Sequence, residues 1–228
     1  MIRSLEDESN VLFSILGVGV TKPVVMTWVI MLVLVLLSIL ATRNLKDVPG
    51  PLQNLAEIAV EKLENFFADI MGYQHMRRYF PIFATLFLFI VASNYSGLIP
   101  GAGHLFPVPT ASLSVTAGLA AVAFFATHSI GIRRQGFGGY MKSFLKPFAF
   151  LLPLTIIEQA VRPFSLALRL YGNLFGEERV TGQLTTMFPI LLPLVMQVLS
   201  VLFCLIQTMV FTMLLAIFVN EATGEEEQ

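Results

Sequence analysis

Three long windows of the sequence contain no Asp, Glu, Lys or Arg: residues 23–42, 79–132 and 180–220. A helix that crosses a bilayer needs about 20 mostly apolar residues, so each window is long enough for at least one crossing. Charged residues make up 13% of the 228 residues, whereas soluble domains carry about 25%. We therefore predict an all-α, multi-pass membrane protein with no nucleic-acid partner.

Apolar runs and turn residues divide the chain into five membrane-embedded helices and one amphipathic surface helix, within a single integral membrane domain over residues 1–228. In the surface helix, apolar residues recur at three- and four-residue steps with Glu and Lys between them. The last two segments exceed one crossing, since residues 188–219 would extend about 48 Å against about 30 Å of hydrocarbon. We expect them to form a long tilted hairpin. The predicted segments are span 1 at 24–42, the surface helix at 51–71, span 2 at 79–99, span 3 at 110–131, and the hairpin helices at 148–183 and 188–219.

The distribution of basic residues predicts the orientation. Lys and Arg follow spans 1 and 3, whereas the loop 100–109 has none. The positive-inside rule then places the N-terminus outside and the C-terminus in the cytoplasm. Acidic residues at positions 6–8 argue against a cleaved signal peptide, and we expect a bacterial inner membrane or, alternatively, an organelle inner membrane. Cys204 is the only cysteine, which excludes an internal disulfide and favours a buried apolar role.

A polar stripe interrupts the penultimate segment, in the stretch RPFSLALRLYGN. On a helix, six residues fall within an arc of about 80°; Glu177 lies at the edge of this arc and Glu178 on the opposite side. An arginine at the centre of a membrane helix costs about 2.5–3.5 kcal/mol on insertion scales. Such a residue faces the protein interior, a partner or a water-filled path. The six residues of the stripe are Glu158, Arg162, Ser165, Arg169, Asn173 and Gly176.

The last segment has its own stripe, which contains Gln197, Ser200, Cys204 and Gln207. A hairpin that turns near residue 188 would bring Arg169 and Gln207 to the same depth. The Gln207 amide oxygen can accept a hydrogen bond from a guanidinium but cannot neutralise its charge. Because Glu158 and Glu177 are about three and two turns from Arg169, we expect another chain to supply the anion.

Residues 162–178, RPFSLALRLYGNLFGEE, resemble the signature of subunit a of the F-type ATP synthase. That signature has a basic residue and Pro, then Ser-Leu, then Leu-Arg-Leu-Phe-Gly-Asn and a later acid. The stretches FLFIVASNYSGLIPG, TASLSVTAGLA, GFGGYMKSF and IQTMVFTMLLAIFV resemble, in order, the family's second span, third span, basic loop and last helix. The resemblance therefore covers nearly the whole chain.

The resemblance implies a non-catalytic stator subunit that provides two half-channels to carboxylates on a rotating ring of c subunits. It also implies b-type stator subunits and the remaining F1Fo complex as partners, with the lipid bilayer around them. The translocated ion would be H⁺ or Na⁺, and no cofactor or metal is implied. By motif position, Arg169 is the essential arginine between the half-channels. The other implied ion-translocation residues are Ser165, Asn173, Glu178 and Gln207, and Glu177, Asn94 and Ser200 are candidate half-channel lining.

The sequence departs from the family pattern at three positions. Tyr171 replaces the usual Phe, Arg179 follows the motif acid, and Ser200 stands where some members carry a histidine. Arg179 therefore offers Glu178 a local partner, and a relay through a titratable ring is not available at position 200.

Simpler roles remain open for several of these residues. Arg162 is expected to extend toward the cytoplasmic interface, and a packing role, with hydrogen bonds elsewhere, is the alternative for Gln207. The three histidines, His75, His104 and His128, lie near predicted membrane boundaries and are expected to be interfacial. Two other functions compete: a secondary transporter, which would show inverted repeats, and an intramembrane enzyme, which would show a nucleophile or a metal motif.

Overall fold

The computed structural model describes residues 11–15, 18–43, 45–98, 107–144, 150, 152–187 and 191–223. The protein is an all-α membrane protein, as the apolar windows predict, with short 3-10 turns η1 (Ser96–Leu98) and η2 (Pro109–Ala111). A small antiparallel hairpin of β1 (Val11–Ile15) and β2 (Val18–Thr21), which the sequence did not predict, precedes the first helix. The helices are α2 (Lys22–Thr42), α3 (Pro51–Met71), α4 (Tyr73–Tyr95), α6 (Leu113–Ser143), α7 (Leu152–Met187) and α8 (Leu191–Thr223).

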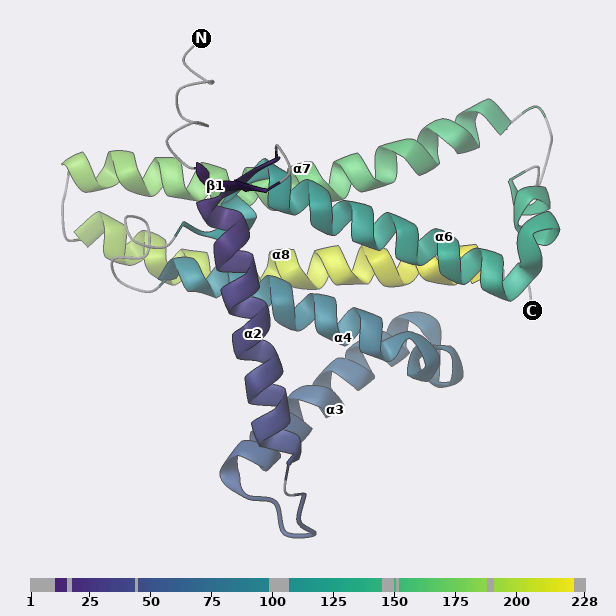
Figure 1. Cartoon of the computed structure of the whole chain (residues 1–228), viewed down its shortest axis with the longest axis horizontal. Coiled ribbons are helices and arrows are strands. Elements are labelled where there is room, and N and C mark those ends of the chain that lie inside the picture. Colours follow the sequence, from purple (N-terminus) through teal and green to yellow (C-terminus); the bar gives the residue numbers. More distant parts are fainter. Residues whose placement is uncertain are drawn as a thin grey trace.

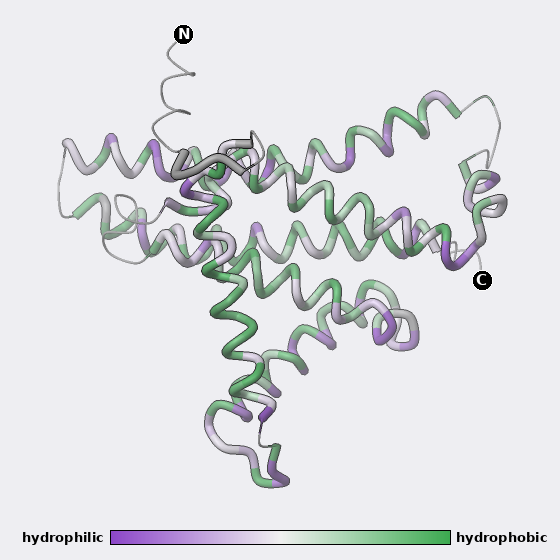
Figure 2. The backbone as a smooth tube through the Cα atoms, viewed as in Figure 1, coloured by the Kyte–Doolittle hydropathy of each residue, from purple (hydrophilic) through white to green (hydrophobic). Residues whose placement is uncertain are grey.

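Four helices in the described ranges are long and apolar enough to cross a membrane: Lys22–Thr42, Met76–Leu98, Leu113–Ser143 and Leu194–Thr223. They belong to α2, α4, α6 and α8. The helix α7 is not among them, since acids and arginines recur along it. Figure 2 shows the contrast between the almost uniformly apolar α2 and the polar residues along α7. The predicted number of five membrane-embedded helices therefore stays a prediction.

The helix α3 is amphipathic over residues 51–71, the range in which the apolar residues recur at helical spacing. Its buried side consists of Leu63, Phe67 and Met71, and the Phe67 ring lies 5.2 Å from the ring of Phe83 in α4. The chain reverses between the two helices at Gly72, whose φ of 75° is costly for other residues. Packing against α4 therefore accounts for the buried part of this side, whereas Leu52 and Leu55 near the start of α3 stay exposed.

The helices α7 and α8 pack as the two arms of the predicted long hairpin, and their tilt in the bilayer stays a prediction. They run side by side in opposite directions, and α2 crosses them at a steep angle (Figure 1). Their 36 and 33 residues correspond to about 54 and 50 Å, which exceeds the roughly 30 Å of a hydrocarbon core. Leu166, Leu170 and Leu174 of α7 and Phe211 and Leu215 of α8 are buried in the common core. The predicted turn at residue 188 lies outside the described residues.

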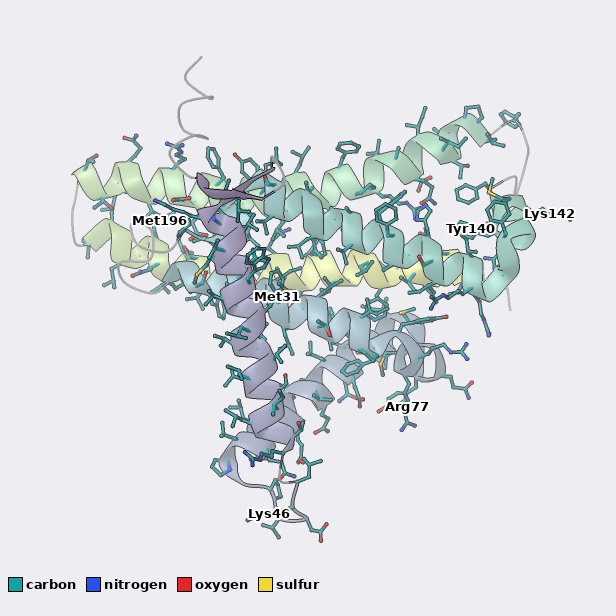
Figure 3. The ribbon with its side chains drawn as sticks, in the orientation of Figure 1. Met31, Lys46, Arg77, Tyr140, Lys142 and Met196 are labelled. Atoms are coloured by element: carbon teal, nitrogen blue, oxygen red, sulfur yellow. The ribbon has the colours of Figure 1, made fainter. Side chains whose placement is uncertain are left out.

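The structure differs from the sequence prediction at the end of span 3, where we expected a loop after residue 131. Helical structure continues to Ser143, with a change of direction at Gly136, whose φ is 71°. The second part returns toward the first, so the Tyr140 ring lies against Gly131, where a Cβ would come within 2.5 Å of that ring. Figure 3 shows Tyr140 and Lys142 on this returning segment. The two glycines explain why a polar, glycine-containing sequence folds as a helical hook.

Candidate functional site

A cavity of about 150 Å³ lies among the second half of α7, the first half of α8 and the region around the end of α4. It is large enough for several water molecules. Two carboxylates and several neutral polar groups contribute to its wall, so that water or a hydrated cation would find hydrogen-bond partners there. The polar lining residues are Asn94, Glu177, Glu178, Thr181, Gln197 and Ser200.

The two adjacent acids differ in their surroundings. Glu177 is half-buried, and its carboxylate accepts a hydrogen bond from the Ser200 hydroxyl of α8. Glu178 is exposed, about 100° further around the helix, although it lines the same cavity. Sequence reasoning put Glu177 only at the edge of the polar stripe, because the rotation of α7 about its axis cannot be read from a pattern. Glu177 is the acid that contacts α8.

Asn94 joins three elements at the wall of this cavity. Its amide nitrogen donates to the Thr208 hydroxyl at 3.2 Å and to the Cys204 carbonyl at 3.4 Å. Its amide oxygen accepts a hydrogen bond of 2.8 Å from Thr110 in η2. A buried amide in an apolar layer is costly unless its hydrogen bonds are made, so this junction fixes α8 against α4. The expectation that Cys204 is buried is confirmed.

A second cavity, of about 190 Å³, lies at the other end of the α7–α8 hairpin. Its wall includes Tyr140, Glu158, Arg162 and Glu221. The Arg162 guanidinium is paired with both carboxylates, and only 16% of its side chain is exposed. The expectation that Arg162 extends toward the cytoplasmic interface stays a prediction. Sequence reasoning missed Glu221. The available signal was that Glu221 is the first charged residue after the uncharged window 180–220.

Arg169 lies between the two cavities, on the exposed side of α7. No hydrogen bond or ion pair joins it to another residue in the described ranges. Counting eight residues along each helix from the Glu177–Ser200 contact places Arg169 level with Thr208, next to Gln207. The Gln207 amide nitrogen and the Asn173 amide nitrogen are buried and have no hydrogen-bond partner in the described part of the chain. The arginine and two amides thus leave unused donors within about 6 Å of one another along the helix axis.

The remaining sequence-predicted residues lie in varied places. Ser165 is exposed on α7, near the Arg169 side. Arg179 stacks over the Phe175 ring at 5.0 Å rather than forming an ion pair with Glu178, within the residues described. His128 is half-buried and its Nδ1 atom lies 2.9 Å from the Phe124 carbonyl oxygen, and its interfacial position stays a prediction. The side chains of His75 and His104 lie outside the described residues.

Comparison with known proteins supplies the family. The fold places the chain among multi-pass, all-α membrane proteins. A family model described as "ATP synthase A chain" matches residues 24–220. The chain belongs to this ATP synthase A chain family.

Curated bacterial relatives match over most of their length. The chain is 44% identical over 203 residues to "ATP synthase subunit a 3" of Pelobacter propionicus, and the aligned region covers 87% of this chain and 86% of that protein. It is 42% identical over 206 residues to "ATP synthase subunit a" of Trichlorobacter lovleyi, with coverages of 89% and 87%. The protein of the same name from Moorella thermoacetica is 42% identical over 203 residues, with coverages of 89% and 91%.

Proposed function

We propose that the chain is the ion-translocating stator subunit a in the membrane sector of an F1Fo ATP synthase. It has no catalytic site of its own and couples ion flow to rotation of a ring of c subunits, with b-type subunits completing the stator. The observation that carries the proposal is Arg169, an exposed cation without an anion in the described chain, between two polar cavities. Family membership supports the same assignment.

The two cavities provide separate half-channels on either side of Arg169. Glu177 is eight residues from Arg169 and Arg162 is seven residues from it, or about 12 and 10 Å along the helix axis. An ion entering through the Glu177–Glu178 cavity reaches a ring carboxylate on one side of Arg169. It leaves through the cavity near Arg162 after the ring has turned. Asn94 and Ser200 line the first path, and Ser165, Asn173 and Gln207 lie on the helices beside Arg169.

Electrostatics explains why an arginine stands between the cavities. A carboxylate about 4 Å from a fixed positive charge is stabilised in its ionised form by about 4 kcal/mol at an effective dielectric of about 20. Arg169 therefore releases the ion from each passing ring carboxylate. Its charge also opposes direct passage of a cation from one cavity to the other. Lysine serves less well, because burial removes its proton more readily and it lacks a planar fork of donors.

The same proposal includes the orientation of the chain as one integral domain in a bacterial inner membrane, with an organelle inner membrane as the alternative. Lys46, Arg77 and Lys142 lie near the ends of helices rather than along them (Figure 3). The positive-inside rule places these ends in the cytoplasm. The N-terminus is then outside, and the C-terminus after α8 is inside.

Copurification tests the proposal. A tagged chain extracted from its own membranes in mild detergent is expected to bring down a small proteolipid with a membrane-embedded acid, together with F1 subunits. The matched control is the same tag on an unrelated multi-pass protein from the same membranes. Ion transport by the isolated chain in vesicles, without a proteolipid, would instead support an independent transporter.

A further inference from the structure

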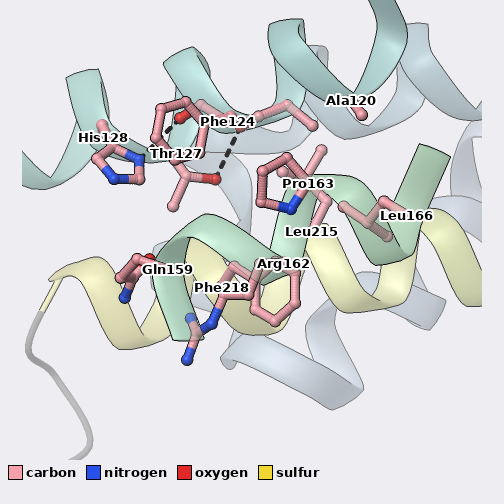
Figure 4. A pocket seen from close by; sticks show the side chains of 11 residues that line it. Ala120, Phe124, Thr127, His128, Gln159, Arg162, Pro163, Leu166, Leu215 and Phe218 are labelled. Atoms are coloured by element: carbon pink, nitrogen blue, oxygen red, sulfur yellow. Dashed lines mark hydrogen bonds between the residues drawn. The ribbon is translucent and has the colours of Figure 1, made fainter. Parts of the chain in front are cut away.

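Arg162 connects the cytoplasmic end of α7 to the end of α8. One of its terminal nitrogens lies 2.6 Å from a Glu158 oxygen in the same helix, and the other lies 2.5 Å from a Glu221 oxygen in α8. Figure 4 shows Arg162 beside Phe218. The guanidinium carbon lies 4.5 Å from the centre of that ring. The planar fork of arginine suits such simultaneous contacts, whereas lysine presents a single point charge.

The next residue, Pro163, is a point at which α7 can bend. Proline within a helix removes one backbone hydrogen bond and clashes with the preceding turn, so it is a point at which a helix bends. Pro163 lies inside α7, with Glu158 and Arg162 before it and Arg169 after it. The contact with Glu221 therefore fixes the part of α7 that precedes the weak point.

The end of α8 is itself anchored to a third helix. The Gln135 amide nitrogen of α6 donates to the Ala222 carbonyl at 2.9 Å. The same carbonyl oxygen lies 3.0 Å from where a Cβ on Gly131 would stand, so α6 and α8 approach closely there. Because Glu221 precedes this anchored residue, the Arg162–Glu221 ion pair ties α7 to a fixed point.

We propose that Arg162 is a positioning residue for ion release: by bridging Glu158 and Glu221 it holds α7 closed against α8 across Pro163 and sets the opening of the second cavity. The inference rests on the proposed function, since it concerns the exit half-channel. Loss of the bridge lets the first part of α7 pivot at Pro163. The cavity then widens past Arg169, so that this residue no longer separates the two cavities and ions pass without turning the ring.

Charge reversal tests the bridge without removing its charges. Arg162→Glu alone places three carboxylates together, and Glu221→Arg alone leaves two arginines against one acid. Each single change is expected to lower ion pumping per ATP hydrolysed by at least about tenfold, since misplacing a reacting group by about 1 Å can cost about a hundredfold. The double change restores one arginine between two carboxylates and is expected to recover pumping to within about threefold of the unaltered complex, which a double-mutant cycle quantifies.

The measurement uses inverted vesicles that contain the complete complex, with pumping and ATP hydrolysis recorded together and the amount of assembled chain determined by blotting. Arg133→Glu, an equal charge change at an exposed site on α6, is the control that should leave the ratio unchanged. A normal ratio in both single variants would overturn the proposal, and so would a double variant no better than the singles.

A spectroscopic arm separates opening of α7 from general loss of stability. Spin labels at Ile156 and Met213 report on the segment before Pro163, and labels at Val180 and Val198 report on the far end of the hairpin; all four side chains are exposed. In Arg162→Glu the first distance distribution is expected to broaden while the second is unchanged. Equal broadening of both would mean that Arg162 only stabilises the whole hairpin.

Failure of this inference is distinguishable from failure of the proposed function. Arg169→Lys is measured in the same vesicles. If that variant loses pumping while the Arg162 and Glu221 variants pump normally, the bridge has no role in release but the proposed function stands. If Arg169→Lys also pumps normally, the proposed function itself is wrong.

Discussion

Replacing Arg169 by Gln or Lys is expected to abolish ATP-driven ion pumping while the complex still assembles. Gln removes about 4 kcal/mol of stabilisation from the ionised ring carboxylate, a factor of about a thousand in the equilibrium for ion release. Lys keeps a charge but loses the fork that contacts a carboxylate through two parallel hydrogen bonds. The measurement is ion uptake into inverted vesicles on addition of ATP, normalised to the amount of chain in the membrane.

The matched control is Arg133→Gln, which removes the same charge from an exposed position on α6. It is expected to retain pumping within about twofold, as is usual for surface changes. Assembly should be unaffected by the Arg169 changes, because that side chain has no hydrogen bond or ion pair among the described residues that folding would lose. Normal pumping in Arg169→Lys would contradict the assignment of this residue.

Removing both acids of the first cavity is expected to give the second large effect. Glu177 and Glu178 line one cavity, so either carboxylate can attract an incoming cation when the other is neutralised. We expect Glu178→Gln alone to slow transport by about threefold and the double change to slow it by about a hundredfold, typical of losing a group that transfers protons. Both rates are measured as ATP synthesis driven by an imposed ion gradient.

The position of the acids also predicts what should not happen. Neither variant should create a passive leak, since Arg169 still separates the cavities. Ser200→Ala is a useful companion, because it removes the hydroxyl that donates to Glu177 while leaving both carboxylates in place. A leak in Glu178→Gln, or normal synthesis in the double variant, would show that these acids do not form the access path.

The sequence predicted the features that depend on local pattern. Uncharged windows indicate membrane helices because a bilayer excludes unpaired charge, and the excess length of the last two segments predicts their tilt. The three- and four-residue steps in residues 51–71 predict an amphipathic helix, and α3 is one, with Leu63, Phe67 and Met71 buried. The stripe that contains Arg169 follows from helical geometry alone.

The features that depend on tertiary packing were not predictable in this way. Whether Glu177 or Glu178 contacts α8 depends on the rotation of α7 about its axis. The buried leucines of the core determine that rotation, and a hydrophobic pattern does not predict it to within one residue. The pairing of Arg162 with Glu221 joins residues far apart in sequence. The hook at the end of α6 requires a positive φ at Gly136 and a contact between the Tyr140 ring and Gly131. Neither requirement can be read from a glycine-containing loop sequence.

The most direct measurement of the central claim is a crosslinking scan from α7 in the intact complex. Single cysteines are placed in a Cys204→Ser background at Ser165, Gly172 and Gly176 on the Arg169 side, and at Ala160 and Tyr171 on the opposite side. A Cβ at either glycine would meet nothing within 4 Å, so these two changes fit the fold. Crosslinks to a small proteolipid from the Arg169 side alone are the predicted result. No crosslink from the Arg169 side would contradict the claim that this face meets a c-ring.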